Sequence, residues 1–438
     1  MKKASEAISW IHSLLPFGIK PGLKRMEWML ERLENPEKKS TFIHIAGTNG
    51  KGSTVSYLRN ILESAGYSVG TFTSPFIECF EERISLNGHP ISEEDLLRAA
   101  NKIRPLVEEL AKTELSSPTE FEVITTMAFE HFAHQANPDF VLMEVGLGGR
   151  FDSTNVLTPI ASVITSIGHD HMHILGNSIE EIASEKAGII KAGVPVISGV
   201  LDPKAANVIQ QVARNMNANL YELNRDFSYQ KKKMNEKEQH FSFLSDGFTI
   251  EQAIIEMKGE HQLQNASVAL KTIALLKEDH KLHITEDHIL KGLKQTSWIG
   301  RFEILSSDPL VVIDGAHNEE GLQALAETLK SQYPTRNYRF VFSATKEKDT
   351  GILLAPFKNM DAYFTFTEFE FFKAATAKEL YENAPIQQKS LQPNWRVAVK
   401  EALKSLEENE MLIITGSLYF ISDIRKAYQQ GEWDLVKI

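Results

Sequence analysis

The segment that most constrains the fold is a glycine-rich loop between a predicted strand and a predicted helix. Residues 41–46 (TFIHIA) form an apolar run of strand length, and residues 47–54 (GTNGKGST) follow directly. Glycines let backbone N–H groups close around an anion, the N-terminus of the next helix adds partial positive charge, and Lys51 adds a full one. This pattern predicts a site for nucleotide phosphates, in which Ser53 or Thr54 offers a hydroxyl to Mg²⁺.

The loop departs from the common nucleotide-binding pattern, which requires glycine at position 45 and Ser or Thr at position 52. The chain has Ile45 and Gly52 at these positions, so we interpret the loop as a variant with its own spacing. A purely structural turn is the alternative, but two glycines around a lysine between strand and helix favour phosphate binding. The loop alone indicates a nucleoside triphosphate and does not indicate the reaction.

Short apolar runs alternate with helical patterns along most of the chain. Predicted strands in the first part are residues 41–46, 69–73, 140–145, 160–165 and 195–198. A second series is predicted at residues 310–313, 340–342, 362–366 and 411–415. Predicted helices include residues 179–188, 203–216, 261–277, 285–295, 319–331, 377–382, 394–406 and 419–428. This alternation predicts an α/β fold with largely parallel sheets covered on both faces.

The length of 438 residues exceeds one ordinary hydrophobic core, so two or three domains are expected. We predict an N-terminal ATP-binding domain at residues 1–297, with a P-loop-type, mostly parallel sheet. A smaller, Rossmann-like α/β domain is predicted at residues 298–438. Such a pair favours a substrate cleft between the domains. The polar run at residues 231–239 is interpreted as an exposed hairpin tip, with a binding site as the less favoured alternative.

Charge and cysteine content exclude several classes of partner. The formal net charge is -11 and no long run of Lys and Arg occurs, which argues against a nucleic-acid partner. No stretch approaches the roughly 20 apolar residues of a membrane helix. Residues 1–15 mix charged and apolar side chains, which is typical of an amphipathic helix and not of a signal peptide. With Cys79 as the single cysteine, we expect a cytoplasmic protein, and we expect a monomer.

Carboxylates and histidines follow two of the predicted strands. Glu144 ends the strand at residues 140–145, where open α/β sheets place ligands and magnesium, although a surface cap is the alternative. Residues 168–173 (GHDHMH) resemble a zinc site by composition. The adjoining phosphate loop instead favours a hard divalent cation with at most one imidazole ligand. Each of these histidines taken alone is better explained by a loop or capping role.

Other candidates have ordinary interpretations when taken one at a time. Lys186 lies on a predicted helix, and its local sequence predicts a solvated surface lysine. Asn265 lies on another helix, while Arg301 and Asp314 flank the start of the second strand series. Each of these three fits a cap or a turn. The position of Arg301 and Asp314 beside the domain junction favours a composite site.

Taken together, nine segments resemble the Mur ligase superfamily, and more narrowly the folylpolyglutamate synthases and their bifunctional dihydrofolate synthase relatives. They run in family order over nearly the whole chain: HIAGTNGKGST (44–54), TSPFIECFEERISLNG (73–88), TEFE (119–122), EVGLGGRFDSTN (144–155), TSIGHDHMHILG (165–176), EKAGIIK (185–191), GRFE (300–303), DGAHN (314–318) and TGSLYFISDIR (415–425). The first segment is shared by Mur-type ligases in general, whereas the TSPF, FDSTN and IGHDH segments narrow the resemblance to folate enzymes.

The resemblance implies a role for each matching position. ATP would be bound by Thr48, Asn49, Gly50, Lys51, Gly52, Ser53, Thr54, Asn265, Arg301 and Asp314. Mg²⁺, expected as two ions, would be bound by Ser74, Glu144, His171 and a CO2-derived carbamate on Lys186; a monovalent cation is left open. Folate would contact Phe121, Asp152, Ser153, Thr154 and Asn155, and glutamate would contact His317 and Ser417. The implied catalytic residues are Lys51, Lys186 and His317.

The implied activity is that of an ATP-dependent ligase with folate, ATP and L-glutamate as small-molecule substrates. A folate carboxylate attacks the γ-phosphate of ATP, and the amine of L-glutamate then displaces phosphate from the acyl phosphate. Whether dihydropteroate is also an acceptor stays open. A P-loop kinase or regulatory NTPase would explain the phosphate loop but not the second α/β series. A peptidoglycan-type Mur ligase shares the loop, and the folate-type segments count against it.

Overall fold

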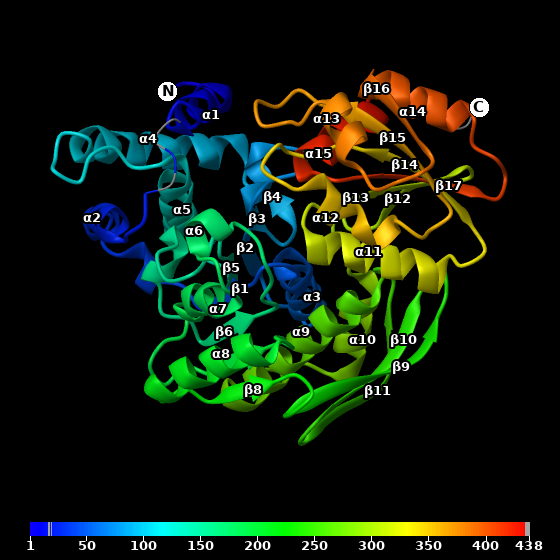
Figure 1. Cartoon of the computed structure of the whole chain (residues 1–438). Helices are drawn as coiled ribbons and strands as arrows, with labels where there is room; N and C mark the ends of the chain where they lie inside the picture. Colours follow the sequence, from blue (N-terminus) through cyan, green and yellow to red (C-terminus); the bar gives the residue numbers. More distant parts are fainter. Residues whose placement is uncertain (16–17, 19, 434–438) are drawn as a thin grey trace. The chain divides into compact units, whose positions relative to one another are not determined.

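The computed structural model describes residues 1–15, 18 and 20–433, and its contacts divide the chain into two compact units (Figure 1). Unit 1 comprises residues 1–230, 241–254 and 263–296, and unit 2 comprises residues 231–240, 255–262 and those from Ser297 onward. Two units built of strands and helices confirm the predicted α/β class. The domain boundary after residue 297 stays a prediction, because segments 231–240 and 255–262 also belong to unit 2.

Unit 1 is built on an eight-stranded sheet in the order β4-β3-β2-β5-β1-β6-β7-β8. The strands are β1 Phe42–Ala46, β2 Val69–Phe72, β3 Ile84–Leu86, β4 His89–Pro90, β5 Phe140–Glu144, β6 Ala161–Ile164, β7 Val196–Ser198 and β8 Leu220–Glu222. All pairings from β2 to β8 are parallel, and only β2–β3 and β3–β4 at one edge are antiparallel. The mostly parallel sheet is therefore confirmed.

Helices cover this sheet on two sides. They are α1 Ala4–His12, α2 Lys24–Arg32, α3 Lys51–Ser64, α4 Glu93–Leu110, α5 Glu120–His131, α6 Met172–Leu175, α7 Ile179–Ala187, α8 Pro203–Asn215, α9 Glu260–Asp279 and α10 Glu286–Gln295. One apolar cluster joins α1, α2, α4 and α5 to β2 and β5, and another joins α7 and α8 to β6 and β7. None of our predicted helices covers residues 93–131, where α4 and α5 lie.

A separate three-stranded sheet contains β9 Phe227–Met234, β10 Gln239–Ser245 and β11 Phe248–Ile255. The polar run predicted as a hairpin tip lies here, but only residues 235–238 form the turn. Residues 231–234 continue strand β9, with their side chains mostly exposed. The run thus forms the mostly exposed tip of the β9–β10 hairpin, as predicted, and includes the end of β9 as well as the turn.

Unit 2 contains a six-stranded sheet in the order β12-β13-β17-β14-β15-β16. Its strands are β12 Glu303–Ser307, β13 Leu310–Asp314, β14 Asn337–Phe342, β15 Ala362–Glu368, β16 Lys389–Asn394 and β17 Glu410–Thr415, and its helices are α11 Glu319–Gln332, α12 Thr350–Leu354, α13 Ala377–Asn383, α14 Trp395–Lys404 and α15 Leu418–Gln429. Only β12 is antiparallel to its neighbour. Our predictions missed β12 and β16, two edge strands without a buried apolar run.

The unit 2 core depends on stacked aromatic rings between neighbouring parallel strands. Phe340 on β14 and Phe364 on β15 stack with ring centroids 4.2 Å apart and planes 7° apart. Phe357 meets Phe340 edge-on at 5.1 Å, and all three rings are fully buried. Removing the central ring would leave a cavity that rigid strands cannot close.

We therefore expect Phe340→Ala to lower the free energy of unfolding by about 3–5 kcal/mol. Phe372→Ala is the control, because that ring is 81% exposed, and it should change the same quantity by less than about 0.5 kcal/mol. Urea unfolding followed by circular dichroism measures both. Equal effects of the two substitutions would contradict the packing described for this sheet.

Candidate active site

The phosphate loop joins the carboxyl end of β1 to the N-terminus of α3. Gly50 is the N-cap residue of α3, with a φ of 85°, and Lys51 is the first residue of the helix. The Lys51 ammonium donates to the carbonyl oxygens of Gly47 at 3.0 Å and Thr48 at 3.3 Å. The side chain therefore folds back over its own loop, which concentrates positive charge at the helix N-terminus.

The segment that follows β6 braces this loop. The Thr48 N–H donates to the Ser166 carbonyl at 2.9 Å, and the Asn49 N–H donates to the Ser166 hydroxyl at 2.9 Å. The Thr165 hydroxyl donates to the Asn49 carbonyl at 2.6 Å. The Gly168 N–H donates to the Thr48 hydroxyl at 3.0 Å. The sequence predicts no such role for residues 165–168, where the available signal is polar residues directly after a predicted parallel strand.

Asn265 on α9 lies against the loop from the other side. A Cβ atom on Gly50 would approach the Asn265 Oδ1 within 2.3 Å, so only glycine permits this contact and the positive φ together. Asn265 itself is buried. The structure thus brings one of the predicted ATP residues from α9 to the loop.

The two hydroxyls at the start of α3 are both buried. Ser53 and Thr54 lie in the first turn, and Thr54 Oγ1 is a buried atom without a hydrogen-bond partner in the described part of the chain. An unpaired buried hydroxyl is costly, so a ligand that supplied a partner would stabilise this turn.

Glu144 ends β5 next to the phosphate loop. The β1–β5 register pairs Ile45 with Glu144, and the carboxylate is almost fully buried. The Ser74 backbone N–H donates to Glu144 Oε2 at 3.3 Å. Two of the predicted metal ligands are therefore neighbours at the carboxyl edge of the sheet. A carboxylate and a serine oxygen suit a hard cation such as Mg²⁺.

Lys186 contradicts the prediction of a solvated surface lysine, since its residue is only 4% exposed. Helix α7 lies directly on the glycine segment after β5: the Arg150 N–H donates to the Glu185 carbonyl at 2.8 Å, and a Cβ on Gly149 would lie 2.9 Å from the Lys186 carbonyl oxygen. The missing side chain at Gly149 permits this approach. The local helical sequence could not reveal it, because the burial comes from a distant segment.

Burial also changes the chemistry of this amine. The pKa of Lys186 is lowered to about 7, mainly by burial and secondly by the nearby charge of Lys51, while Asp170 and Asp152 oppose the change. Near neutral pH a substantial fraction is then the uncharged amine. An uncharged amine can add CO2 and become a carbamate, whereas an ammonium cannot. The residue therefore fits the predicted carbamate.

The histidine side chains of residues 168–173 do not converge on one point. His171 has a φ of 50° and a side chain that is 48% exposed, with its Nε2 3.9 Å from Asp170 Oδ2. The His173 ring lies 6.3 Å from the His171 ring. Within residues 1–15, 18 and 20–433, no group of three or more His, Cys, Asp or Glu side chains is arranged to hold a metal. The predicted magnesium ligands include only one carboxylate side chain, Glu144, and one imidazole, His171. The prediction therefore does not require a cluster of three His, Cys, Asp or Glu side chains.

The predicted folate segment at residues 152–155 is buried and internally bonded. Asp152 accepts hydrogen bonds from the Leu147 N–H at 2.8 Å and the Thr154 hydroxyl at 2.6 Å, and burial raises its pKa above the ordinary value. Burial lowers the pKa of His44 to about 3, so its ring is neutral. Because the Thr154 hydroxyl donates to Asp152, it accepts the hydrogen bond from His44 Nε2 at 2.8 Å. These contacts hold the segment to β1. Contact of Asp152, Ser153, Thr154 or Asn155 with a substrate stays a prediction.

Unit 2 carries the remaining candidates. Burial raises the pKa of Asp314, opposed by Arg301, and its carboxylate accepts the N–H groups of Phe302 and Ala316 at 2.8 Å each. Strands β13 and β17 are parallel neighbours with Asp314 paired to Thr415. His317 and Ser417 therefore follow two adjacent strands at the same edge of the sheet. The His317 Nδ1–H donates to the Gly315 carbonyl at 2.8 Å.

No helix in residues 1–15, 18 and 20–433 is long and apolar enough to cross a membrane.

Known protein families match both parts of the chain. The sequence profile of the Mur ligase middle domain matches residues 45–273, and that of the Mur ligase glutamate ligase domain matches residues 300–418. The dihydrofolate synthase/folylpolyglutamate synthase of Bacillus subtilis is 45% identical over 425 residues, which is 96% of this chain and 98% of that protein.

Solved structures agree. The folylpolyglutamate synthase of Thermotoga maritima has a TM-score of 0.85 at 34% identity, covering 98% of this chain and 97% of that one. E. coli FolC in complex with DHPP and ADP has a TM-score of 0.87 at 28% identity, with 98% of each chain covered. The chain therefore belongs to the Mur ligase superfamily and, within it, to the family of folylpolyglutamate and dihydrofolate synthases.

Proposed function

We propose that this chain is an ATP-dependent ligase that adds L-glutamate to the carboxylate of a reduced folate. The observation that carries this proposal is the braced phosphate loop, with Lys51 over its carbonyls and the buried Lys186 within range of its charge. The relatives named above support the same activity, including one held with ADP. A relative named for both reactions supports dihydropteroate as a second acceptor.

The reaction has two steps. The acceptor carboxylate attacks the γ-phosphate of ATP, which forms an acyl phosphate and releases ADP. The amine of L-glutamate then attacks the acyl carbon, and inorganic phosphate leaves. Lys51 and the N–H groups at the start of α3 stabilise negative charge on the phosphoryl oxygens, which is the main electrostatic contribution in phosphoryl transfer.

The residues proposed to hold Mg²⁺ are Ser74, Glu144, His171 and a carbamate on Lys186, with two ions expected and a monovalent cation left open. When bound, the metal would neutralise phosphate charge. Carbamate formation joins CO2 to the neutral Lys186 amine and releases one proton. The remaining residues are proposed to orient ATP. Residues 48–54 and Asn265 would bind its phosphates and base, and Arg301 and Asp314 of unit 2 would also contact it.

We further propose that Phe121 and residues 152–155 serve the folate side and that His317 and Ser417 orient the incoming glutamate. The two functional domains are proposed to be residues 1–297 and 298–438. A cytoplasmic, monomeric enzyme without a nucleic-acid partner fits these small substrates.

Acceptor dependence tests the proposal directly. With wild-type protein, ADP should be released only when both a folate acceptor and L-glutamate are present, and tetrahydrofolate and dihydropteroate should be compared as acceptors. ADP release without glutamate and acceptor would instead support an NTPase. Turnover with UDP-muramyl substrates would support the peptidoglycan-type alternative, for which the comparisons offer no support.

Lys51→Ala should lower ligation by roughly a hundredfold or more, because it removes the full charge from the phosphate loop. The variant should remain folded, as circular dichroism can verify. Lys204→Ala is the matched control, since that lysine is exposed on α8. Near-normal turnover of Lys51→Ala would remove the basis for the phosphate assignment.

Glu144→Ala and His171→Ala should each raise the Mg²⁺ concentration needed for half-maximal ligation and lower the maximal rate, because each is a proposed ligand. His169→Ala and His173→Ala are controls from the same segment and should change this requirement less. Unchanged magnesium titrations for both Glu144→Ala and His171→Ala would show that the metal lies elsewhere.

Lys186→Ala should be strongly impaired and partly rescued by added acetate, since a diffusing carboxylate can imitate a carbamate oxygen. Lys186→Glu should retain more activity than Lys186→Arg, because arginine keeps the positive charge and forms no equivalent carbamate. The reverse order would indicate that the lysine acts as a cation. A crystal structure with unmodified Lys186 at physiological CO2 would contradict the carbamate equally directly.

A further inference from the structure

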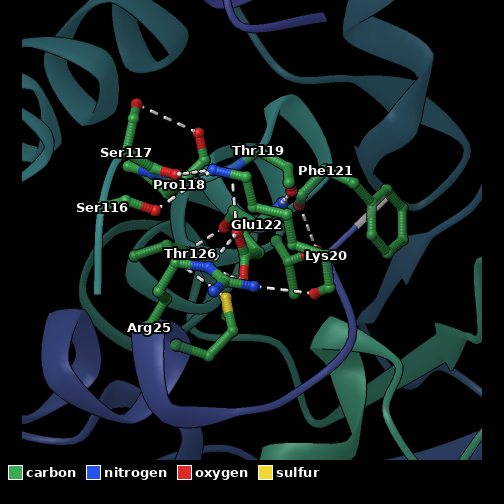
Figure 2. Close-up of polar contacts among 11 residues, drawn as sticks. Lys20, Arg25, Ser116, Ser117, Pro118, Thr119, Phe121, Glu122 and Thr126 are labelled. Atoms are coloured by element: carbon green, nitrogen blue, oxygen red, sulfur yellow. Dashed lines mark hydrogen bonds and ion pairs between the residues drawn. The ribbon is translucent and has the colours of Figure 1, made fainter. Parts of the chain in front are cut away.

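Arg25 and Glu122 form a buried ion pair, and neither residue has been given a role so far (Figure 2). The Arg25 Nε contacts both carboxylate oxygens of Glu122, at 2.9 and 3.0 Å. The two side chains are only 12% and 3% exposed. The guanidinium also donates from Nη2 to the Lys20 carbonyl at 2.7 Å. The pair therefore ties the segment at the start of α2 to the start of α5.

Glu122 has a second task at the start of α5. Its carboxylate accepts the Thr119 N–H at 2.7 Å, and the Thr119 hydroxyl accepts the Glu122 N–H at 3.2 Å. This reciprocal pair is the capping box that begins the helix. A second tie joins the same two segments, because the Lys20 ammonium donates to the Ser117 carbonyl at 3.0 Å. The Glu122 carboxylate thus fixes the first residue of α5 and also binds the start of α5 to the segment that contains Lys20 and Arg25.

Phe121 lies between these capping residues and points toward the sheet. Its ring centroid is 5.8 Å from that of Phe72 on β2. A Cβ on Gly146 would come within 2.4 Å of its Cζ, so the ring lies directly over the backbone two residues after Glu144. The start of α5 therefore decides how the Phe121 ring meets the carboxyl edge of the sheet.

We propose that Arg25 is a positioning residue for the aromatic end of the acceptor. It acts through Glu122, which fixes the first turn of α5 and with it the Phe121 ring. The inference rests on the proposed function, since it takes Phe121 to be on the folate side. Arg25 itself touches neither ATP nor glutamate in this scheme. Its loss should therefore weaken acceptor binding selectively.

The test is steady-state kinetics of Arg25→Met, Glu122→Gln and the double variant, with tetrahydrofolate, ATP and L-glutamate varied in turn. We expect the KM for tetrahydrofolate to rise roughly tenfold in each single variant, the size typical of a lost charged hydrogen bond. The kcat and the KM values for ATP and glutamate should stay within about twofold. The double variant should be no worse than either single variant, because both act through one contact. Arg25→Lys keeps the charge and should recover part of the acceptor KM.

A matched pair on the same helix provides the control. Lys102 on α4 pairs with Glu130, which lies near the other end of α5 and is equally buried. Lys102→Met and Glu130→Gln should leave the acceptor KM unchanged even if they destabilise the fold. A similar rise in both pairs, or an unchanged KM in Arg25→Met, Glu122→Gln and Arg25→Lys, would overturn the inference.

The two proposals fail in different ways. If wild-type protein releases no ADP in response to folate acceptor and glutamate, the proposed function fails and the inference fails with it. If wild-type protein is active but the Arg25 and Glu122 variants keep a normal acceptor KM, only the positioning role is wrong. An equal rise in the KM values for ATP and acceptor would also contradict it, because that result indicates a general loss of structure.

Discussion

The parallel pairing of β1 with β6 is the constraint on which the candidate site depends. Its register sets Ala46 against Ile164, so the residues after the two strands emerge side by side. Thr165 and Ser166 can then hold the backbone of Thr48 and Asn49 through hydrogen bonds of 2.6–2.9 Å. The residues after β6 accept the N–H groups of Thr48 and Asn49 and donate to the carbonyl of Asn49. These bonds preorganise the start of the loop before any ligand binds.

The second physical theme is the burial of charge beside this loop. Lys186 and Glu144 lie almost entirely inside unit 1, and the backbone contact between α7 and the glycine segment at residues 146–150 holds Lys186 there. Burying an ammonium near the charge of Lys51 is unfavourable, and the protein responds by lowering the pKa of Lys186. Such a cost is typical of functional sites, where a reactive group is made available at the expense of stability.

Much of this fold is predictable from the sequence, for a simple reason. Central parallel strands such as β1 and β5 are buried on both faces, so they stand out as apolar runs followed by polar residues. Edge strands β12 and β16 lack that signal and were missed. Lys186 shows the other limit: its helix looks solvated because burial comes from a segment nearly forty residues away. The ion pair of Arg25 with Glu122 was missed likewise, since ninety-seven positions separate the partners.

Transfer of oxygen from a folate acceptor to phosphate distinguishes an acyl-phosphate ligase from a kinase or NTPase, and the use of a folate distinguishes it from a peptidoglycan-type Mur ligase. The acceptor is labelled with ¹⁸O in its reacting carboxylate and turned over with ATP and L-glutamate, and the released phosphate is analysed by mass spectrometry. If the carboxylate attacks the γ-phosphate and glutamate then attacks the acyl carbon, each phosphate carries one ¹⁸O atom from the acceptor. Phosphate free of label, released in step with amide formation, would contradict this mechanism and the role assigned to the phosphate loop.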